Sequence, residues 1–384
     1  MLNSPYRAFV SGAAELHGKR MDRSAYDLHL LVGRAAIHDA GLPAAAIDGV
    51  LTGQPVYEGD PSFGMTVAEG LGISRVRYAQ TVQIGGASPC AMLNLAARAV
   101  SSGWCHAVLV IYADNRLTAT ADGAPVVERP VDAVHREFER PVGPTIPALY
   151  AMVATRHMHL YGSRAEQLAA IAVQARSNAL RTEGAVMTKP ITIDDVLASR
   201  PIAAPLRLLD CCLFTDFAGA VIVTSAALAG DSPHPRVAVL GGGEGHTHAH
   251  LTMAPDLLTG GAAMSGQTAF AQAGITPAQV DFVQLYDCFT IAVALQLEEL
   301  GFCARGEGPE FAASGALAPD GRLPFNTNGG MLSFHNGGIY HLTEAVRQLR
   351  GAAGERQLGR AAVGLVHGNG GVFSHHATVI LASG

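Results

Sequence analysis

The sequence predicts an α/β protein whose two duplicated halves form a five-layered αβαβα sandwich. Strands and helices alternate along both halves of the 384-residue chain, which is typical of parallel sheets covered by helices. A helix expected over residues 88–102 is apolar or small on almost every side, so it must be buried between two layers. A Gly-Gly pair precedes this helix, and a second pair precedes the helix around residues 341–347, which indicates an internal duplication.

The first half is expected to alternate regularly between strands and helices. Ser24 is a suitable N-cap for an amphipathic helix that ends before Gly41. Ser88 is expected to be the N-cap of the apolar helix, with Pro89 at its first position. The run that follows this helix is strongly β-prone. The predicted strands are residues 7–10, 47–51, 79–84 and 107–112, and the predicted helices are residues 24–40, 63–70 and 88–102.

The second half repeats this order after a proline-rich boundary at residues 233–235. We therefore expect an N-terminal half at 1–232, with a loop insertion at about 115–207, and a C-terminal half at 233–384. The insertion is too long for a routine connection, which favours a functional role. The remaining predicted elements are helices at 147–161, 164–181, 266–273 and 288–300 and strands at 219–224, 236–240, 281–285, 360–366 and 378–381.

Composition excludes several classes of protein. The 26 basic and 32 acidic residues give a net charge of −6 without a lysine and arginine run, so no nucleic-acid partner is expected. No apolar stretch reaches the roughly 18 to 20 residues of a membrane span, and the N-terminus does not resemble a signal peptide. We therefore expect a cytoplasmic protein without a membrane partner. The six cysteines include no C-x-x-C pair, so no metal site is expected.

Four segments carry a resemblance to a known family. They are Tyr286-Asp-Cys-Phe-Thr290, Asn326-Thr-Asn-Gly-Gly-Met-Leu-Ser333, Glu344-Ala-Val-Arg-Gln-Leu-Arg-Gly351 and Ser199-Arg-Pro-Ile-Ala-Ala-Pro-Leu-Arg207. On these segments the chain resembles the thiolase superfamily, and within it the sterol-carrier or nonspecific lipid-transfer type, along nearly its whole length. The resemblance implies the five-layered thiolase fold, a CoA thioester as substrate and no bound cofactor.

The nucleophile of a thiolase is missing from its expected position. Thiolases attack CoA thioesters with a cysteine thiolate at the N-terminus of the buried helix after the third strand, where the macrodipole lowers the thiol pKa. By the resemblance, this position falls on Gly86. Cys90 lies inside the first helical turn and could replace the nucleophile only if the loop is shifted. Otherwise it is a small buried thiol of the helix face.

The second motif places Tyr286, Asp287 and Cys288 at the C-terminal end of a strand, where ligands of α/β sheets collect. Tyr286 stands where the family has an asparagine or histidine of the oxyanion hole. Its phenol could donate to an enolate oxygen, or exchange a proton if neighbouring donors or positive charge lower its pKa. Cys288 matches the acid/base cysteine of sterol-carrier thiolases or, as the first residue of an apolar helix, belongs to the core.

Two further loops carry candidate residues. One replaces the Gly-His-Pro motif of the family, and in it His335 is the candidate that faces the thioester carbonyl. Tyr340, about one helical turn further, either points into the same cleft or packs in the core. The glycine loop after residue 366 lacks the second catalytic cysteine of degradative thiolases. His367 lies at or next to that place and could act as an acid or base or orient another group.

Loss of the nucleophile with retention of the carbonyl-binding loops favours a reaction that needs only enolate stabilisation. Retro-aldol cleavage of a 3-hydroxyacyl-CoA is such a reaction. The chain resembles thiolase-like aldolases that shorten steroid side chains. By that resemblance Tyr286 and Tyr340 form the acid/base pair and His335 polarises the thioester. The alternatives are a thiolase or acyltransferase that uses Cys90 on a β-ketoacyl substrate, and a non-catalytic subunit that binds acyl-CoA or a partner enzyme.

The resemblance also implies partner chains. The aldolases work with a small OB-fold and zinc-ribbon protein that supplies part of the acyl-CoA site, and we expect such a partner here. Thiolase folds dimerise through a strand after the nucleophile helix, to which we assign residues 107–112. A strand so apolar would be costly to leave as an open edge. We therefore expect a homodimer, or a heterotetramer with two partner chains.

Overall fold

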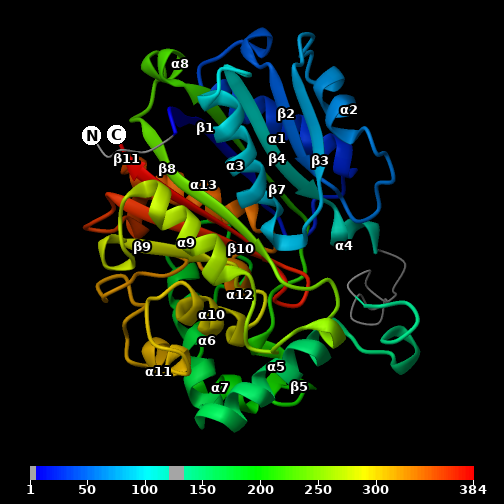
Figure 1. The fold of residues 1–384 in the computed structure, drawn as a ribbon, viewed down its shortest axis with the longest axis vertical. Coiled ribbons are helices and arrows are strands. Elements are labelled where there is room, and N and C mark those ends of the chain that lie inside the picture. Colours follow the sequence, from blue (N-terminus) through cyan, green and yellow to red (C-terminus); the bar gives the residue numbers. More distant parts are fainter. Residues whose placement is uncertain (1–5, 121–133) are drawn as a thin grey trace.

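A large mixed sheet forms the framework of the computed structural model, which describes residues 6–120 and 134–384. From the first half, this sheet takes β1 (Ala8–Leu16), β2 (Gly49–Gly53), β3 (Tyr78–Val82), β4 (Ala107–Asp114) and β7 (Phe217–Ser225). The strands of the second half are β8 (Val237–His246), β9 (Phe282–Leu285), β10 (Val363–Gly370) and β11 (His375–Ser383). Their order in the sheet is β3-β2-β4-β7-β1-β8-β11-β10-β9 (Figure 1).

The sheet has two parts that meet at a short contact. Strand β1 pairs with β8 only at Phe9 with Ala238 and at Val10 with Val237, whereas it pairs with β7 along nearly its whole length. Two helices, α3 (Ser88–Ser101) and α13 (Ile339–Arg350), lie between the two parts and contact strands of both. The predicted pair of central helices is therefore confirmed.

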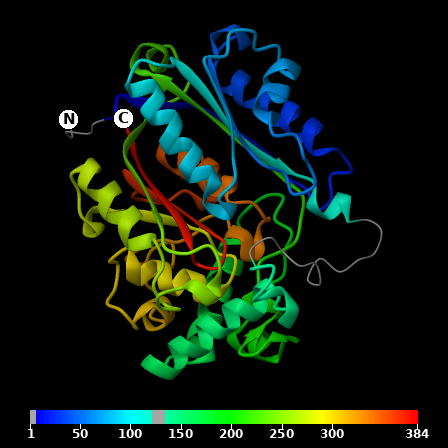
Figure 2. The ribbon, with the colours of Figure 1, turned by 45° about the vertical axis from the view of Figure 1, so that its right-hand side comes forward.

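Further helices cover the outer faces of the two parts. On the first part, α1 (Ala25–Asp39) and α2 (Phe63–Gly70) share a core with β2, β4 and β7. On the second part, α9 (Ala262–Ala273) and α10 (Thr290–Glu299) share a core with β9, β10 and β11. The resulting order of helix, sheet, helix, sheet and helix confirms the five-layered sandwich (Figures 1 and 2).

Local sequence signals explain where several helices begin. The Ser24 hydroxyl accepts a hydrogen bond from the backbone of Asp27 at 3.0 Å, so it caps α1 as predicted. The prediction that Ser88 caps α3 is wrong, because Ala87 is the N-cap and Ser88 is the first helical residue. Its hydroxyl instead accepts from the backbone N–H of Ile84 at 2.9 Å, which fixes the turn before the helix.

The segment between β4 and β7 leaves the sheet and packs against the second half. It contains α4 (Arg116–Ala119), α5 (Ile146–Tyr161), α6 (Ala165–Ala179), α7 (Ile193–Ala198), β5 (Pro201–Ala203) and β6 (Leu206–Arg207). Helices α5 and α6 contact α10, and α6 also contacts α11 (Gly308–Ala313), at the lower end of the molecule in Figure 1. Residues 121–133 of the predicted irregular stretch lie outside the described residues.

The structure overturns the predicted dimerisation strand. Strand β4 is hydrogen-bonded to β2 on one side and to β7 on the other, so it has no free edge for a second chain. All eight of its residues are buried. Its apolar character therefore reflects a position inside the sheet, whose outermost strands are β3 and β9.

Within the described residues, no helix combines the length and hydropathy that crossing a bilayer requires.

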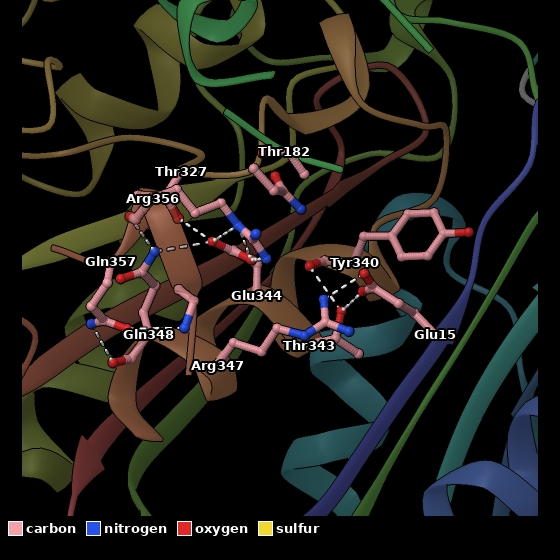
Figure 3. Close-up of polar contacts among 12 residues, drawn as sticks. Glu15, Thr182, Thr327, Tyr340, Thr343, Glu344, Arg347, Gln348, Arg356 and Gln357 are labelled. Atoms are coloured by element: carbon pink, nitrogen blue, oxygen red, sulfur yellow. Dashed lines mark hydrogen bonds and ion pairs between the residues drawn. The ribbon is translucent and has the colours of Figure 1, made fainter. Parts of the chain in front are cut away.

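Helix α13 is held in the centre of the fold by buried charges (Figure 3). The fully buried carboxylate of Glu344 accepts from the Arg356 guanidinium at 2.9 Å and from the Thr327 hydroxyl at 2.6 Å. One turn further, Arg347 pairs with Glu15 of β1. The motif that begins at Glu344 thus fixes α13 to both halves of the molecule.

We expect Arg356→Met to lower the free energy of unfolding by about 3 kcal/mol, because it leaves the Glu344 carboxylate buried without its counterion. Urea unfolding measures this change. The matched control is Arg20→Met, which removes one partner of an exposed ion pair with Asp22 and should cost less than about 1 kcal/mol. Equal costs for the two variants would contradict the role assigned to Glu344.

Candidate active site

Tyr286 lies where the N-terminal ends of the two central helices meet. It follows β9 directly, and its backbone N–H donates to the carbonyl of His367 at 3.0 Å. Its ring packs against Gly86, in the turn before α3, and against Gly338, the N-cap of α13. A Cβ atom at Gly86 would lie 2.1 Å from Tyr286 Cζ, and one at Gly338 would lie 3.1 Å from the same ring. The tyrosine therefore fills the space in front of α3 that a side chain at residue 86 would need.

The surroundings of Tyr286 keep its phenol protonated at neutral pH. Burial raises the pKa of Tyr286 well above 10, and the neighbouring Cys288 thiol acts in the same direction. The guanidinium of Arg116 opposes this shift without cancelling it. Proton exchange by Tyr286 was expected only if its pKa were lowered, and the structure shows the opposite shift. The protonated phenol is suited to donate a hydrogen bond.

Arg116 is a residue that the sequence analysis missed. It begins α4, two residues after β4 ends, and its Nε donates to the buried carboxylate of Asp114 at 2.9 Å. The guanidinium lies over the Phe217 ring, with 5.3 Å between Cζ and the ring centroid, and its Nη1 is 3.5 Å from Asn336 Oδ1. A charged residue just beyond the carboxyl end of an apolar strand was the signal that could have identified it.

Asp287 is fixed by three donors. Its oxygens accept from the backbone N–H groups of Met331 and Leu332 at 2.9 and 3.0 Å, in the short helix α12 (Gly330–Ser333). His341 Nε2 lies 3.1 Å from the same carboxylate. The His341 ring centroid is 6.2 Å from that of Tyr286, within the range of aromatic contacts. His341 is the second residue that the sequence analysis missed.

Cys288 lies in a buried polar group beside Tyr286. Its sulfur is 3.9 Å from Asn369 Nδ2, which also donates to the Tyr150 hydroxyl at 2.9 Å. Helix α10 begins at Thr290, so Cys288 precedes the helix that it was expected to begin. Burial raises the pKa of the Cys288 thiol well above its usual value, which keeps it protonated.

The structure does not place Tyr340 beside Tyr286. The Tyr340 hydroxyl donates to the carbonyl of Leu16 at 2.6 Å and accepts from the backbone N–H of Ala218 at 3.1 Å, so the backbone of the first half occupies it. Successive residues of a helix point about 100° apart. For this reason His341, rather than Tyr340, lies near Tyr286, and the pairing of the two tyrosines expected from the resemblance is not observed.

His335 and His367 also make contacts other than the expected ones. His335 is buried, and its Nε2 donates to the carbonyl of Gly184 at 2.9 Å. His367 Nδ1 lies 2.8 Å from the Thr378 hydroxyl, and its Nε2 lies 2.9 Å from His376 Nδ1. From the glycine loop that carries His367, it is Asn369 that contacts Cys288.

Cys90 is not displaced toward the site. It is 1% exposed in the first turn of α3, inside the core between the two parts of the sheet. Burial raises the pKa of its thiol, so the nucleophilic thiolate is strongly disfavoured. The loop shift that a relocated nucleophile requires is therefore absent, and Cys90 is a core residue in this structure.

Among the described residues, no three His, Cys, Asp or Glu side chains are grouped so as to hold a metal ion.

The chain is similar to known thiolase-like enzymes. It is 37% identical to the 17-hydroxy-3-oxo-4-pregnene-20-carboxyl-CoA lyase of Mycobacterium tuberculosis, over 90% of this chain and 92% of that protein. The chain belongs to the thiolase superfamily. Within it, the steroid side-chain-cleaving aldolase of Thermomonospora curvata is 36% identical over 89% of each chain. A family described as thiolase C-terminal domain-like matches residues 243–383.

A solved structure agrees with this assignment. The Ltp2-ChsH2(DUF35) aldolase superposes with a TM-score of 0.88 and 33% identity, covering 100% of this chain and 99% of that one. Lyases and aldolases of the thiolase superfamily are thus similar to this chain over almost its whole length. This confirms the superfamily, the fold and the enzyme class expected from the sequence.

We expect Gly86→Ala to lower the free energy of unfolding by about 1 to 3 kcal/mol, because the new methyl group would overlap the Tyr286 ring and the Asn369 carbonyl. Gly59→Ala is the matched control, since a Cβ there meets nothing within 4 Å. In a double-mutant cycle, Tyr286→Ala should relieve part of the cost at residue 86. Strict additivity of the two substitutions would show that the glycine and the ring are not in contact.

Proposed function

We propose that this protein cleaves the Cα–Cβ bond of a 3-hydroxyacyl-CoA by a retro-aldol reaction, which yields a ketone or aldehyde and a shorter acyl-CoA. The observation that carries the proposal is the position of Tyr286 in the space that a nucleophile on residue 86 would occupy. Acyl transfer through an acyl-enzyme needs a thiolate, whereas a retro-aldol cleavage needs a proton acceptor and a group that stabilises an enolate.

Tyr286 is suited to stabilise the enolate. Its protonated phenol can donate to the thioester oxygen as negative charge develops there, and a donor fixed in a mostly buried site costs little reorganisation. The nearby guanidinium of Arg116 favours negative charge in the same place. Both groups therefore interact more strongly with the enolate than with the neutral thioester, which is the condition for catalysis.

The acyl group that we propose is bulky and polycyclic or aromatic. Support comes from the similar enzymes, one of which is named for a steroid CoA thioester and another for cleavage of a steroid side chain. In the steroid thioester the hydroxyl on carbon 17 is β to the thioester carbonyl, so a retro-aldol step would release a steroid ketone and propionyl-CoA. This thioester is therefore a suitable probe of the reaction.

We expect Tyr286→Phe to lower kcat for cleavage of 17-hydroxy-3-oxo-4-pregnene-20-carboxyl-CoA by about 10²-fold to 10³-fold, since one enolate donor is lost. KM should change little, because the ring remains in place. Mass spectrometry of the released ketone and propionyl-CoA measures the rate. Tyr161→Phe, which removes a half-exposed hydroxyl bonded to Arg305, is the matched control and should retain full activity.

Two outcomes would contradict this proposal. Wild-type activity in Tyr286→Phe would remove the tyrosine from the reaction. An acyl adduct on the intact protein after exposure to acyl-CoA, lost in Cys90→Ser, would instead show a thiolase or acyltransferase with a relocated nucleophile.

We also propose that the chain assembles with a small OB-fold and zinc-ribbon protein that completes the acyl-CoA site. Support comes from the similar aldolase structure, whose name combines two proteins, Ltp2 and ChsH2. Co-expression with such a protein from the same source should yield a complex that contains zinc and has more than twice the 39.8 kDa mass of one chain in light scattering. Separate elution of the two proteins, with full lyase activity of this chain alone, would contradict the partner.

A further inference from the structure

The proposed function leaves one role in the reaction unfilled, namely the group that accepts the 3-hydroxyl proton. Tyr286 keeps its own proton at neutral pH, so it cannot accept another. Arg116 is a cation and is excluded as a base. Burial raises the pKa of the Cys212 and Cys288 thiols and of the Tyr112 phenol, so these three groups are protonated as well. The groups that act electrostatically on Tyr286 are Cys288, Arg116, Cys212 and Tyr112.

Asp287 is the carboxylate next to Tyr286 in the chain, but its oxygens are occupied. It accepts two backbone N–H groups of α12 and the Nε2 proton of His341. Because a carboxylate accepts and does not donate, the His341 proton must be on Nε2. The carboxylate therefore determines the tautomer and the orientation of the imidazole, as the aspartate does in other acid/base pairs.

The second nitrogen of His341 is a proton acceptor beside the Tyr286 ring, whereas the carboxylate of Asp114 is held in an ion pair with Arg116. In the neutral imidazole its Nδ1 carries a lone pair, and this buried atom has no hydrogen-bond partner among the described residues. The side chain is 3% exposed, and its ring contacts that of Tyr286 across the N-terminal end of α13. Nδ1 of His335 and Nε2 of His376 are also buried without a partner, but of these three histidines it is His341 whose ring contacts that of Tyr286.

A residue with a strained backbone lies beside His341. Asn326 has φ of +40°, a conformation that residues other than glycine rarely adopt. Its side chain accepts from the N–H of Leu285 at 2.8 Å and donates to the carbonyl of the same residue at 2.9 Å. Its Nδ2 lies 3.4 Å from His341 Nε2, and because both atoms are donors in this arrangement, the contact is one of packing and not a hydrogen bond. Asn326 thus fixes the end of β9, directly before Tyr286, while the hydrogen bond to Asp287 orients the imidazole.

We infer that His341, oriented by Asp287, is the catalytic base that takes the 3-hydroxyl proton of the substrate and returns it to Cα. This assignment rests on the proposed retro-aldol function and deepens it. In the first step, Nδ1 accepts the hydroxyl proton, the Cα–Cβ bond breaks, and its electron pair forms the enolate, whose oxygen Tyr286 holds by a hydrogen bond. In the second step, the imidazolium donates the same proton to Cα. No water or oxidant is consumed, and the imidazole is neutral again.

Two measurements on His341→Gln test this inference. Glutamine can keep the hydrogen bond to Asp287 through its amide N–H but has no basic nitrogen. Cleavage of the steroid thioester should fall by about 10²-fold or more, the contribution typical of a general base. Deuterium exchange at Cα of propionyl-CoA in D₂O, which reverses only the second step, should fall by a similar factor. The control is His234→Gln, since His234 forms a partly exposed histidine–carboxylate pair with Asp39, 2.9 Å apart.

The outcomes separate this inference from the proposed function. Loss of both cleavage and exchange in His341→Gln, with an unchanged melting temperature and full activity of His234→Gln, would support the assignment. If the wild-type enzyme cleaves the thioester and His341→Gln cleaves and exchanges at the same rates, His341 is not the base although the lyase function stands. If the wild-type enzyme, with its partner present, neither cleaves nor exchanges, the lyase function fails and the assignment fails with it.

Discussion

The contact between Gly86 and the Tyr286 ring is the constraint on which the rest of the site depends. Only one side chain fits between the N-terminal ends of the two central helices, because a Cβ atom on residue 86 would overlap the ring. A tyrosine from the second half therefore excludes a nucleophile from the first. Where a thiolase has a cysteine that forms a covalent bond, this chain has a phenol that can donate a hydrogen bond. The surrounding thiolase fold is retained.

Helix α13 makes this arrangement rigid. Its ion pairs with Arg356 and Glu15 anchor it to both halves. The Glu344 carboxylate is fully buried, so breaking its pair with Arg356 is costly, and the helix has a fixed position. Gly338 and His341 lie one turn apart at that end, one against the ring of Tyr286 and the other beside Asp287. The motif that begins at Glu344 thus supports the site without contacting it.

Periodicity predicted the fold well because it reports burial directly. The helix at residues 63–70 and the order of strands and helices follow from it, whereas the division at residues 232 and 233 remains a prediction. The strand at residues 107–112 was misassigned because apolar residues do not distinguish the centre of a sheet from a dimer interface. At the site, the second motif identified Tyr286. Whether Tyr340 or His341 lies near it depends on a rotation of about 100° around the axis of α13. The loop before α13 differs in spacing from the Gly-His-Pro motif of the family, so the sequence did not determine this rotation.

Burial favours the neutral forms of the thiols and of the tyrosine at this site. It disfavours the thiolate forms of Cys90 and Cys288, and for the same reason it preserves the proton of Tyr286. Acyl transfer begins with a thiolate, which this buried environment disfavours. The same environment preserves the Tyr286 phenol as a neutral hydrogen-bond donor. The proposed retro-aldol cleavage can begin with a neutral phenol as the hydrogen-bond donor. In the proposed reaction, negative charge develops on the enolate near the positive charge of Arg116, where a weakly screened attraction would lower the barrier to cleavage.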